Sequence, residues 1–409
     1  MVIKPLVAGL KFPGLLILLC CSVVSRGGGF DNSGLPFDII FDSQQKVNEW
    51  RLSFARVRPS IDGSIQPTRQ SGSSAIAVRQ LVPDYSDRHW ALRYRLTDYL
   101  TCALRYEEPY RADVQYADDS LSYLDDASRP AAAPVSSVYQ SELLTTACRV
   151  FWRRGNHVWS LISGIRHQKV RGAFSSDLGP GNQGASDNLD VRLNGGSEVG
   201  QLWGVSWAYP SVAARVTVFY RDAIHYSLTG ETLTPVSMGS PRMRAPANAE
   251  TLTPQTVVLS WQTGIAENWL LFGSFRWSEW RKVDAINVSD GVGNPSLSLY
   301  RNNTLDYNLG MIHQFSQRWK AGFSYASGKK LGGTSGVPGY DSENLRDPQG
   351  RRHIVATGLQ HSPRSDLAVD LLMRYAYLEE KRVLTNSFEA RFPSNQAFSL
   401  ELGFSWFFQ

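Results

Sequence analysis

The chain has 409 residues and a formal net charge of +5, with 12 tryptophans, 17 tyrosines and 18 phenylalanines. We expect no nucleic-acid partner, because this charge is too mild to argue for one. After the first 25 residues, no stretch approaches the ~20 unbroken apolar residues of a membrane helix. Two classes remain, a large β protein or a string of soluble domains.

Residues 1–25 have the order of a secretory signal. Lys4 and Lys11 precede the apolar run GLLILLCCSVV, and small residues follow it. We predict cleavage near Ser25. A lipoprotein anchor at one of the two cysteines in this run is the weaker alternative, because the residue before them is a bulky leucine.

The rest of the chain begins with residues 26–48, which are rich in glycine and then mixed. They show no sustained period, so we predict an irregular N-terminal segment or short hatch. Strands in which apolar and polar residues alternate follow this segment. They are predicted at about 50–61, 89–96, 100–107, 143–152, 157–170, 200–210, 212–228, 256–266, 269–278, 303–315, 318–327, 353–360, 367–378 and 397–408. Polar stretches such as 109–137, 172–196 and 229–254 are predicted as loops.

Thr251–Trp280 shows the alternation most clearly. Leu259 and Trp261 share one face of the first strand, and Phe275 and Trp277 share one face of the second. A soluble sandwich would turn these apolar faces toward a core. A membrane barrel turns them toward lipid and its polar faces toward a lumen.

The count decides between these two folds. There are about fourteen strands, and every second connection is short, which is typical of bacterial outer-membrane barrels. Aromatic residues also gather at both strand ends, as expected at the two interfaces of a membrane. Those near short turns are Trp152, Trp207, Trp269, Trp319 and Trp406, and those at the opposite ends are Tyr106, Tyr220, Trp277 and Tyr377. We predict an all-β, transmembrane antiparallel barrel over residues 49–409, with both termini periplasmic.

The predicted inward faces carry many charges. They include Arg93, Arg95, Arg105, Arg149, Arg215, Arg276, Arg374, Asp306, Asp370 and Glu401. An unpaired charge in a dry core costs several kcal/mol, so these residues are wet, ion-paired or both. They either brace the wall or hold the acid head of a ligand. Arg105, Arg221 and Arg276 are the better ligand candidates, because their strands run toward the long loops.

Three inward phenylalanines, Phe151, Phe219 and Phe272, are candidates to line an apolar ligand pocket. Cys102 and Cys148 lie on the predicted apolar face of their strands. From the face alone, two separate lipid-facing cysteines are favoured over a disulfide.

Several of these segments together resemble one family. TPQTVVLSWQTGIAENWLLFGSFRWSEW resembles the signature hairpin of the FadL/TodX outer-membrane transporters for long-chain fatty acids and aromatic hydrocarbons. GQLWGVSWAYPSVAARVTVFYRDAIHYSLTGE resembles the hairpin before it, and YEEPYRADVQY the segment after strand three. The resemblance runs from about Trp50 to Phe408. The usual Asn-Pro-Ala element of the hatch is absent from residues 26–48.

This resemblance implies a fourteen-stranded barrel with an N-terminal hatch and a sideways exit where strand three kinks. Glu107, Glu108, Pro109 and Tyr110 are the candidate lateral gate. A proline cannot donate to the ladder, so pairing must fail there. The alternative is that strand three simply ends and Pro109 begins a loop.

No catalytic, cofactor or metal motif is found. The seven histidines lack metal-ligand spacing. The acidic segment DVQYADDSLSYLDD lacks the spacing of a calcium loop, so a solvated face is favoured. A hydrolase could still assemble its serine and histidine across strands.

We therefore expect a monomeric channel for passive uptake of hydrophobic small molecules such as long-chain fatty acids, in contact with outer-membrane lipids and lipopolysaccharide. Uptake of aromatic hydrocarbons by the same route and a general diffusion porin are the alternatives. A lipid hydrolase is the least favoured class.

Overall fold

Side chains alternate between a buried and an exposed face along the strands, as β23 (Asn395–Phe408) illustrates. In this computed structural model, the exposed face is the apolar one. Phe398 is 44% exposed, Leu402 is 42% exposed and Trp406 is 51% exposed. A soluble protein would bury such a column of side chains, so the direction of the faces is that of a membrane barrel.

The structure describes residues 37–41, 48–67, 75–116, 133–180, 186–235, 242–283, 285–291, 295–298, 302–331, 349–384 and 388–408. The predicted signal segment and most of the acidic segment after strand three lie outside these ranges. None of the helices in the described ranges is long and apolar enough to cross a bilayer.

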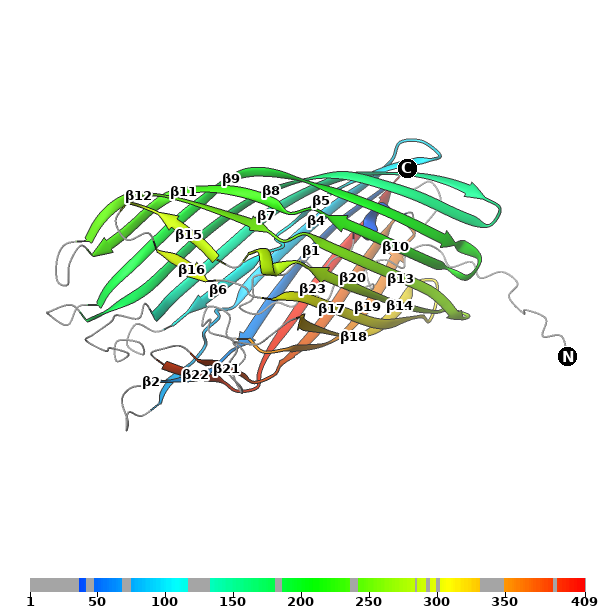
Figure 1. The fold of residues 1–409 in the computed structure, drawn as a ribbon. Coiled ribbons are helices and arrows are strands. Elements are labelled where there is room, and N and C mark those ends of the chain that lie inside the picture. The colour runs from blue at the N-terminus through cyan, green and yellow to red at the C-terminus, as the bar shows by residue number, and fades with distance from the viewer. Residues whose placement is uncertain are drawn as a thin grey trace.

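The predicted fold class is confirmed, because fourteen antiparallel strands close into a barrel (Figure 1). Closure is made by β1, which pairs with β23 on one side and with β4 on the other. In order around the wall the strands are β1 (Asn48–Ser60), β4 (Tyr85–Arg95), β5 (Leu100–Glu107) with β6 (Arg111–Gln115), β7 (Ala133–Arg154), β8 (His157–Pro180), β9 (Ser186–Tyr209), β10 (Ala214–Arg221) with β11 (Ile224–Pro235), β12 (Arg242–Thr253) with β13 (Thr256–Ala266), β14 (Trp269–Ser278), β17 (Asn303–Gln314), β18 (Trp319–Leu331), β19 (Arg352–Arg364), β20 (Leu367–Leu378) and β23.

Smaller elements complete the described chain. A four-stranded sheet lies at the long-loop end of the barrel (Figure 1). Its strands are, in order, β21 (Lys381–Leu384), β22 (Phe388–Phe392), β2 (Gly63–Pro67) and β3 (Ile76–Val78). The remaining elements are β15 (Ala285–Ser289), β16 (Ser296–Ser298) and the 3-10 helices η1 (Asp38–Ile40), η2 (Pro210–Val212) and η3 (Trp280–Lys282).

All three loops predicted above are wrong in part, because strands run through them. β6 lies inside the loop predicted at 109–137, and β7 begins there at Ala133. β8 continues to Pro180 and β9 begins at Ser186, inside the loop predicted at 172–196. β11 and β12 likewise fill most of the loop predicted at 229–254. The glycines here serve close packing, since a Cβ added at Gly195 would lie 2.8 Å from side-chain carbons of both Val170 and Leu228.

The prediction for the two cysteines is also wrong. Cys102 and Cys148 form a disulfide between β5 and β7, with Cα atoms 4.0 Å apart. The ladder register places them directly opposite each other. Their faces were predicted correctly, but the pairing depends on the register between two strands that lie 46 residues apart in sequence.

Residues 37–41 are buried against the inner wall. Phe37, Ile40 and Phe41 are at most 2% exposed and pack on inward side chains of the wall. Those side chains are Ala91, Ala103, Ala147, Ile162, Leu202, Phe219 and Val258. The described part of the predicted short hatch therefore occupies the lumen.

Arginines of the wall hold this segment. Arg93 donates from Nη1 to the carbonyl oxygen of Phe41 at 2.7 Å. The guanidinium groups of Arg149 and Arg215 lie 4.9 Å and 4.2 Å from the centre of the Phe41 ring. Arg215 also pairs with Asp38 at 3.6 Å. Much of the predicted inward charge thus braces the hatch through ion pairs and cation–π contacts.

Candidate functional site

Strand three is interrupted and then resumes. β5 ends at Glu107 and β6 begins at Arg111, and both pair with β7. The five residues from Glu107 to Arg111 lie opposite four on the partner strand, from Leu143 to Gln140, so the interruption is a bulge. The alternative that strand three ends at Pro109 is therefore wrong. Proline fits this position because it has no N–H to give to a ladder.

The β7 side of the interruption remains closed. Tyr110 donates its N–H to Ser141 Oγ at 2.9 Å, and the Ser141 N–H donates to the Tyr110 carbonyl at 2.9 Å. The opposite side is different. The ladder between β4 and β5 ends at the pair Trp90 and Tyr106, whose rings stack at 6.2 Å.

Beyond that pair, β4 continues to Tyr85 along β1, and within the described ranges it forms no ladder with β6. Contacts do cross the space, and one of them places the guanidinium group of Arg111 4.8 Å from the centre of the Tyr85 ring. Arg111 Nη1 reaches the Ser86 carbonyl at 3.4 Å, and farther out the Gln115 N–H donates to Leu81 O at 2.8 Å. We call this unpaired stretch between β4 and β6 the seam.

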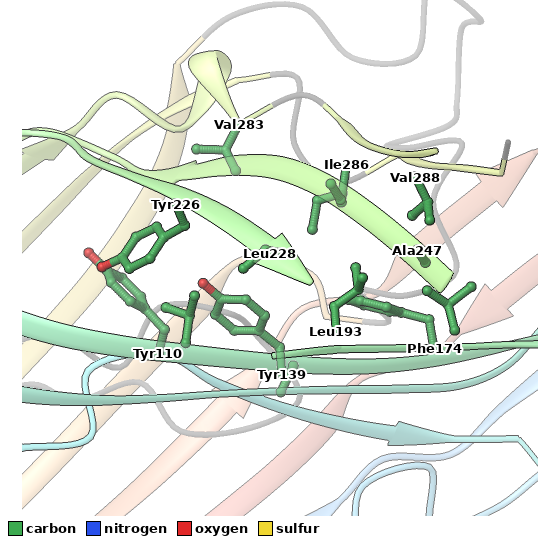
Figure 2. Packing of buried hydrophobic residues seen from close by; sticks show 14 of the residues in the cluster. Tyr110, Tyr139, Phe174, Leu193, Tyr226, Leu228, Ala247, Val283, Ile286 and Val288 are labelled. Carbon is green, nitrogen blue, oxygen red and sulfur yellow. The ribbon is translucent and has the colours of Figure 1, made fainter. Parts of the chain in front are cut away.

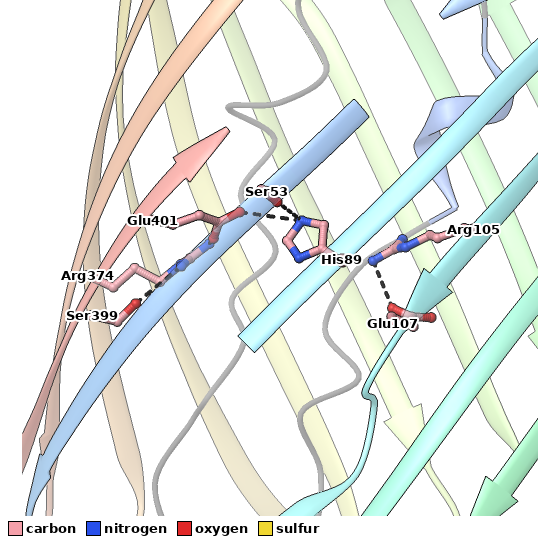
Figure 3. Close-up of polar contacts among 7 residues, drawn as sticks. All are labelled: Ser53, His89, Arg105, Glu107, Arg374, Ser399 and Glu401. Atoms are coloured by element: carbon pink, nitrogen blue, oxygen red, sulfur yellow. Dashed lines mark hydrogen bonds and ion pairs between the residues drawn. The ribbon is translucent and has the colours of Figure 1, made fainter. Parts of the chain in front are cut away.

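Arginines gather on the inner wall beside the seam. Arg105 Nη2 lies 2.8 Å from Glu107 Oε2, as Figure 3 shows. Arg221 is also buried, and its charged neighbours are Glu107, Arg166 and Arg105. Two candidates from the sequence, Arg105 and Arg221, are thus brought together, although β5 and β10 are far apart along the chain.

Arg166 and Gln168 add hydrogen-bonding groups that have no described partner. Arg166 Nη1 donates to the Asp222 carbonyl at 3.0 Å, whereas its buried Nε has no hydrogen-bond partner among the described residues. Gln168 is fully buried, and neither end of its amide is bonded within the same ranges. Such groups cost free energy until something bonds them. They point to a polar group of a ligand.

A large apolar cluster lies farther along the same strands toward the long-loop end. It joins β6, β7, β8, β9, β11 and β12 with η3 and β15, and Figure 2 shows Tyr110, Tyr139 and Tyr226 at one end of it. The Tyr110 ring meets Trp280 edge-on at 5.5 Å. A polar group beside an apolar cluster suits an amphipathic molecule.

This architecture matches solved channels. No protein-family model matches the chain, and no curated protein matches it in sequence. A Pseudomonas aeruginosa FadL homologue is similar in structure, with a TM-score of 0.71 and 15% identity, over 89% of this chain and 91% of that one. The fold is that of the FadL and TodX channels.

Two hydrocarbon transporters share the FadL-like fold. The Ralstonia pickettii toluene transporter TbuX has a TM-score of 0.64 and 12% identity, covering 98% of this chain and all of that one. The Pseudomonas putida toluene transporter TodX has a TM-score of 0.60 and 10% identity, covering 92% and 96%. These neighbours are transporters, and the barrel resembles those of bacterial outer membranes.

The other candidates lie elsewhere in the FadL-like barrel. Arg276 is held by Asp306 on the neighbouring strand, with Nε and Nη2 3.0 Å and 2.5 Å from one carboxylate oxygen. Phe219 faces the hatch, where its ring centre is 6.4 Å from that of Phe41. Phe151 lies under Arg149 at 4.4 Å, and Phe272 packs with Leu270 and Ile312. None of these belongs to the group around Arg105 and Arg221.

Two serine–histidine contacts cross strands of the FadL-like barrel. Ser197 Oγ lies 2.7 Å from His167 Nε2 at an exposed position between β9 and β8, and the other contact is buried in part. Ser53 Oγ is hydrogen-bonded to His89 Nε2, and Glu401 Oε1 lies 3.4 Å from the same nitrogen (Figure 3). A catalytic triad needs the serine and the acid on opposite ring nitrogens. Arg374 also binds Glu401 at 2.7 Å. The contact between Ser53 and His89 is therefore part of a polar network in the lumen and does not have the geometry of a catalytic triad. Among the described residues no cluster of His, Cys, Asp and Glu is placed to hold a metal.

The sequence reasoning missed Arg166 and Gln168. The parity of β8 does place both on the inward side, with Ser160 and Ile162. Parity cannot show which of the many inward polar residues lacks a partner, because that depends on the neighbouring strands.

Proposed function

We propose that this chain is a monomeric FadL/TodX-family channel that takes amphipathic acids, such as long-chain fatty acids, across a bacterial outer membrane and releases them sideways into the bilayer. The observation that carries the proposal is the pair of buried, unbonded groups on Arg166 and Gln168, next to Arg221 and below an apolar cluster. Both termini then face the periplasm, since the long loops face outward.

We call the polar group formed by Arg105, Glu107, Arg166, Gln168 and Arg221 the head site, and its chemistry explains the choice of an acid. A carboxylate accepts hydrogen bonds from guanidinium groups, and charge-assisted bonds are roughly twice as strong as neutral ones. The donor Nε of Arg166 is available for such a bond, and the Gln168 amide can serve a second oxygen. The alkyl chain would lie along the apolar cluster, at about 25 cal/mol for each Å² removed from water.

The seam supports the sideways exit. Glu107, which belongs to the head site, is the last residue of β5 before the interruption at Glu108, Pro109 and Tyr110. The head site and the opening in the hydrogen-bond ladder therefore share the same few residues. A ligand released there would not cross the hatch, which the wall arginines hold in the lumen.

Uptake of aromatic hydrocarbons by the same route is the second candidate, and the likeness to toluene transporters favours it. Toluene has no charged group, so it would form no charge-assisted hydrogen bond with Arg166 or Arg221. The two candidates therefore differ in their dependence on arginine, which an uptake assay can measure.

The test measures uptake of labelled oleate and labelled toluene in cells that have this chain as their only such channel. Replacing Arg166 and Arg221 with alanine should lower oleate uptake about tenfold or more, because each charged hydrogen bond is worth roughly 1.5–3 kcal/mol. Toluene uptake should not change. The matched control is Arg276→Ala with Asp306→Ala, which removes a lumen ion pair without leaving a lone charge.

Oleate uptake that survives the arginine changes would refute the proposal that the ligand is an acid. A wild-type chain that takes up toluene but not oleate would favour the hydrocarbon function. The exit is tested separately. Cysteines at Ser86 and Arg111 are bridged with a short bis-maleimide, and cysteines at Thr146 and Ile165, on two paired strands, serve as the control. Only the first bridge should stop uptake, and equal uptake in both would reject the seam as the exit.

A further inference from the structure

A group of arginines projects from the outer surface of the barrel at one level. Along β1 the outward side chains change from Trp50, Leu52 and Phe54 to Arg56 and Arg58. Along β4 they change from Leu92 and Trp90 to Arg88. The register places Arg88 opposite Phe54 and Ser86 opposite Arg56, so the changes from apolar to charged on the two strands lie one outward pair apart.

This level is the outer edge of the apolar belt. Trp90 stacks on Tyr106 directly below the arginines, and aromatic rings of this kind favour the boundary between hydrocarbon and head groups. The charged atoms above them lie where lipid head groups lie. The apolar column of β1 below them lies where acyl chains lie.

Arg56 and Arg58 share one carboxylate. Arg56 Nη2 lies 3.2 Å from Asp84 Oδ2, and Arg58 Nε lies 3.5 Å from the same oxygen. Their side chains are 57% and 70% exposed. One carboxylate balances only one of these two exposed charges.

Arg88 on β4 and Arg111, across the seam on β6, bring two more cations. The Arg111 side chain is 21% exposed, and its guanidinium group lies 4.8 Å from the centre of the Tyr85 ring. Arg111 reaches the Ser86 carbonyl, and Ser86 lies opposite Arg56 in the ladder. The carboxylate of Glu108 lies 3.7 Å from Arg111 Nη1 and also interacts with Arg88. Asp87 and Glu142 act on Glu108 as well, so the acids near this surface include Asp84, Asp87, Glu108 and Glu142.

We propose that these four arginines, which we call the arginine collar, bind the phosphate groups of a phosphorylated glycolipid of the outer leaflet. Guanidinium groups match phosphate oxygens in pairs, and Arg is preferred over Lys for such forks. The collar has two halves, Arg56 with Arg58 and Arg88 with Arg111. That arrangement suits a head group with two phosphates better than a phospholipid with one.

The collar gives the glycolipid a position beside the seam. Its acyl chains would run down the column of Phe54, Leu52 and Trp50, and its head would lie against the outer side of β4. The inference rests on the proposed outer-membrane location and not on ligand uptake, so either can fail without the other.

The experiment uses the full barrel in detergent, with diphosphoryl lipid A as the probe and native mass spectrometry as the readout. Arg56→Gln with Arg58→Gln should weaken lipid A binding about tenfold or more, since charge-assisted contacts to phosphate are lost. The control is Arg153→Gln with Arg154→Gln, two exposed arginines at the β7–β8 turn, at the other end of the barrel. It removes the same charge and should leave binding unchanged.

Monophosphoryl lipid A and phosphatidylethanolamine are measured beside the probe. A site for two phosphates is supported if both of these lipids bind more weakly than diphosphoryl lipid A. Equal binding of phosphatidylethanolamine, or an equal loss in the control variant, would overturn the proposal. Oleate uptake is measured on the same variants and should remain, which separates this result from the transport mechanism.

Discussion

Cys102 and Cys148 lie directly opposite each other on the outward face of β5 and β7 and are joined as a disulfide. On its other edge, β5 is paired with β4 only as far as Tyr106. Strand three is thus covalently fixed to β7, whereas its ladder with β4 stops at Tyr106. An opening of the wall at this strand is thereby directed to the β4 side, where the seam lies.

Loss of this disulfide should lower the stability of the barrel. The bond closes a loop with a sequence separation of 46 residues, and the chain-entropy model assigns about 4 kcal/mol to such a loop. We expect Cys102→Ala with Cys148→Ala to unfold at a lower temperature in the gel-shift assay for heat-modifiable barrels. Reductant should lower the wild-type midpoint and leave the variant unchanged. Equal midpoints in all samples would contradict a stabilising role.

The hatch should limit ion flow. Phe41 is held by Arg149, Arg215 and the ring of Phe219, and each cation–π contact is worth about 0.5–2 kcal/mol. We expect Phe41→Ala to raise the steady conductance in planar bilayers above a low wild-type level. Phe315→Ala is the control, because this ring is 64% exposed. A wild-type barrel that conducts as freely as the variant would instead favour a general diffusion porin.

The sequence predicts the strand faces well because alternation is a local property. Trp406 and Phe275 are exposed and Phe272 is buried, as their positions in the pattern require. The register between strands is not local, so the Cys102–Cys148 bond could not be read from faces. The same limit hid the contact of Arg149 with the hatch.

The loops predicted at 172–196 and 229–254 were wrong for a related reason, because the predictions relied on their glycine and threonine content. These residues are typical of turns, yet β8, β9, β11 and β12 extend the wall well past the apolar belt. There the side chains pack inward on the apolar cluster, which includes Val191, Leu193 and Leu228. Burial against strands that lie far away in sequence outweighs the weak local preference.

The four-stranded sheet should lose part of its stability in acid. Hydrogen bonds from Arg391 and then Arg382 lower the pKa of Glu380 below its ordinary value of 4.5. A lowered pKa in the folded state gives stability that is present above the unfolded pKa and lost as the pH falls through the folded pKa. Because Glu380 is exposed, the effect is small.

The measurement is hydrogen exchange of the β21 and β22 amides. Glu380→Gln should exchange faster than wild type at pH 7, and the difference should shrink as the pH falls through the lowered pKa of Glu380 and the wild-type carboxylate becomes neutral. Glu389→Gln, on the paired strand β22, controls for loss of a negative charge. A difference that persists at low pH would mean that the carboxylate charge is not the cause.

Gln168 gives the sharpest test of the head site, because function and stability should change in opposite directions. Its buried amide has no partner in the described part of the chain. Gln168→Leu keeps the size and removes the unbonded polar atoms, so the empty barrel should become more stable by about 1–3 kcal/mol. The variant should also bind oleate more weakly, since one donor to the acid head is gone.

Gln360→Leu is the matched control on the far wall. Gln360 is equally buried, but its Nε2 donates to Asp370 Oδ1 at 2.6 Å. Its removal leaves the Asp370 carboxylate without that bond, so this variant should be less stable, with oleate binding unchanged. Unfolding midpoints and oleate titrations on both proteins decide the matter. A Gln168→Leu barrel that is less stable and binds oleate normally would assign Gln168 to the framework and remove it from the head site.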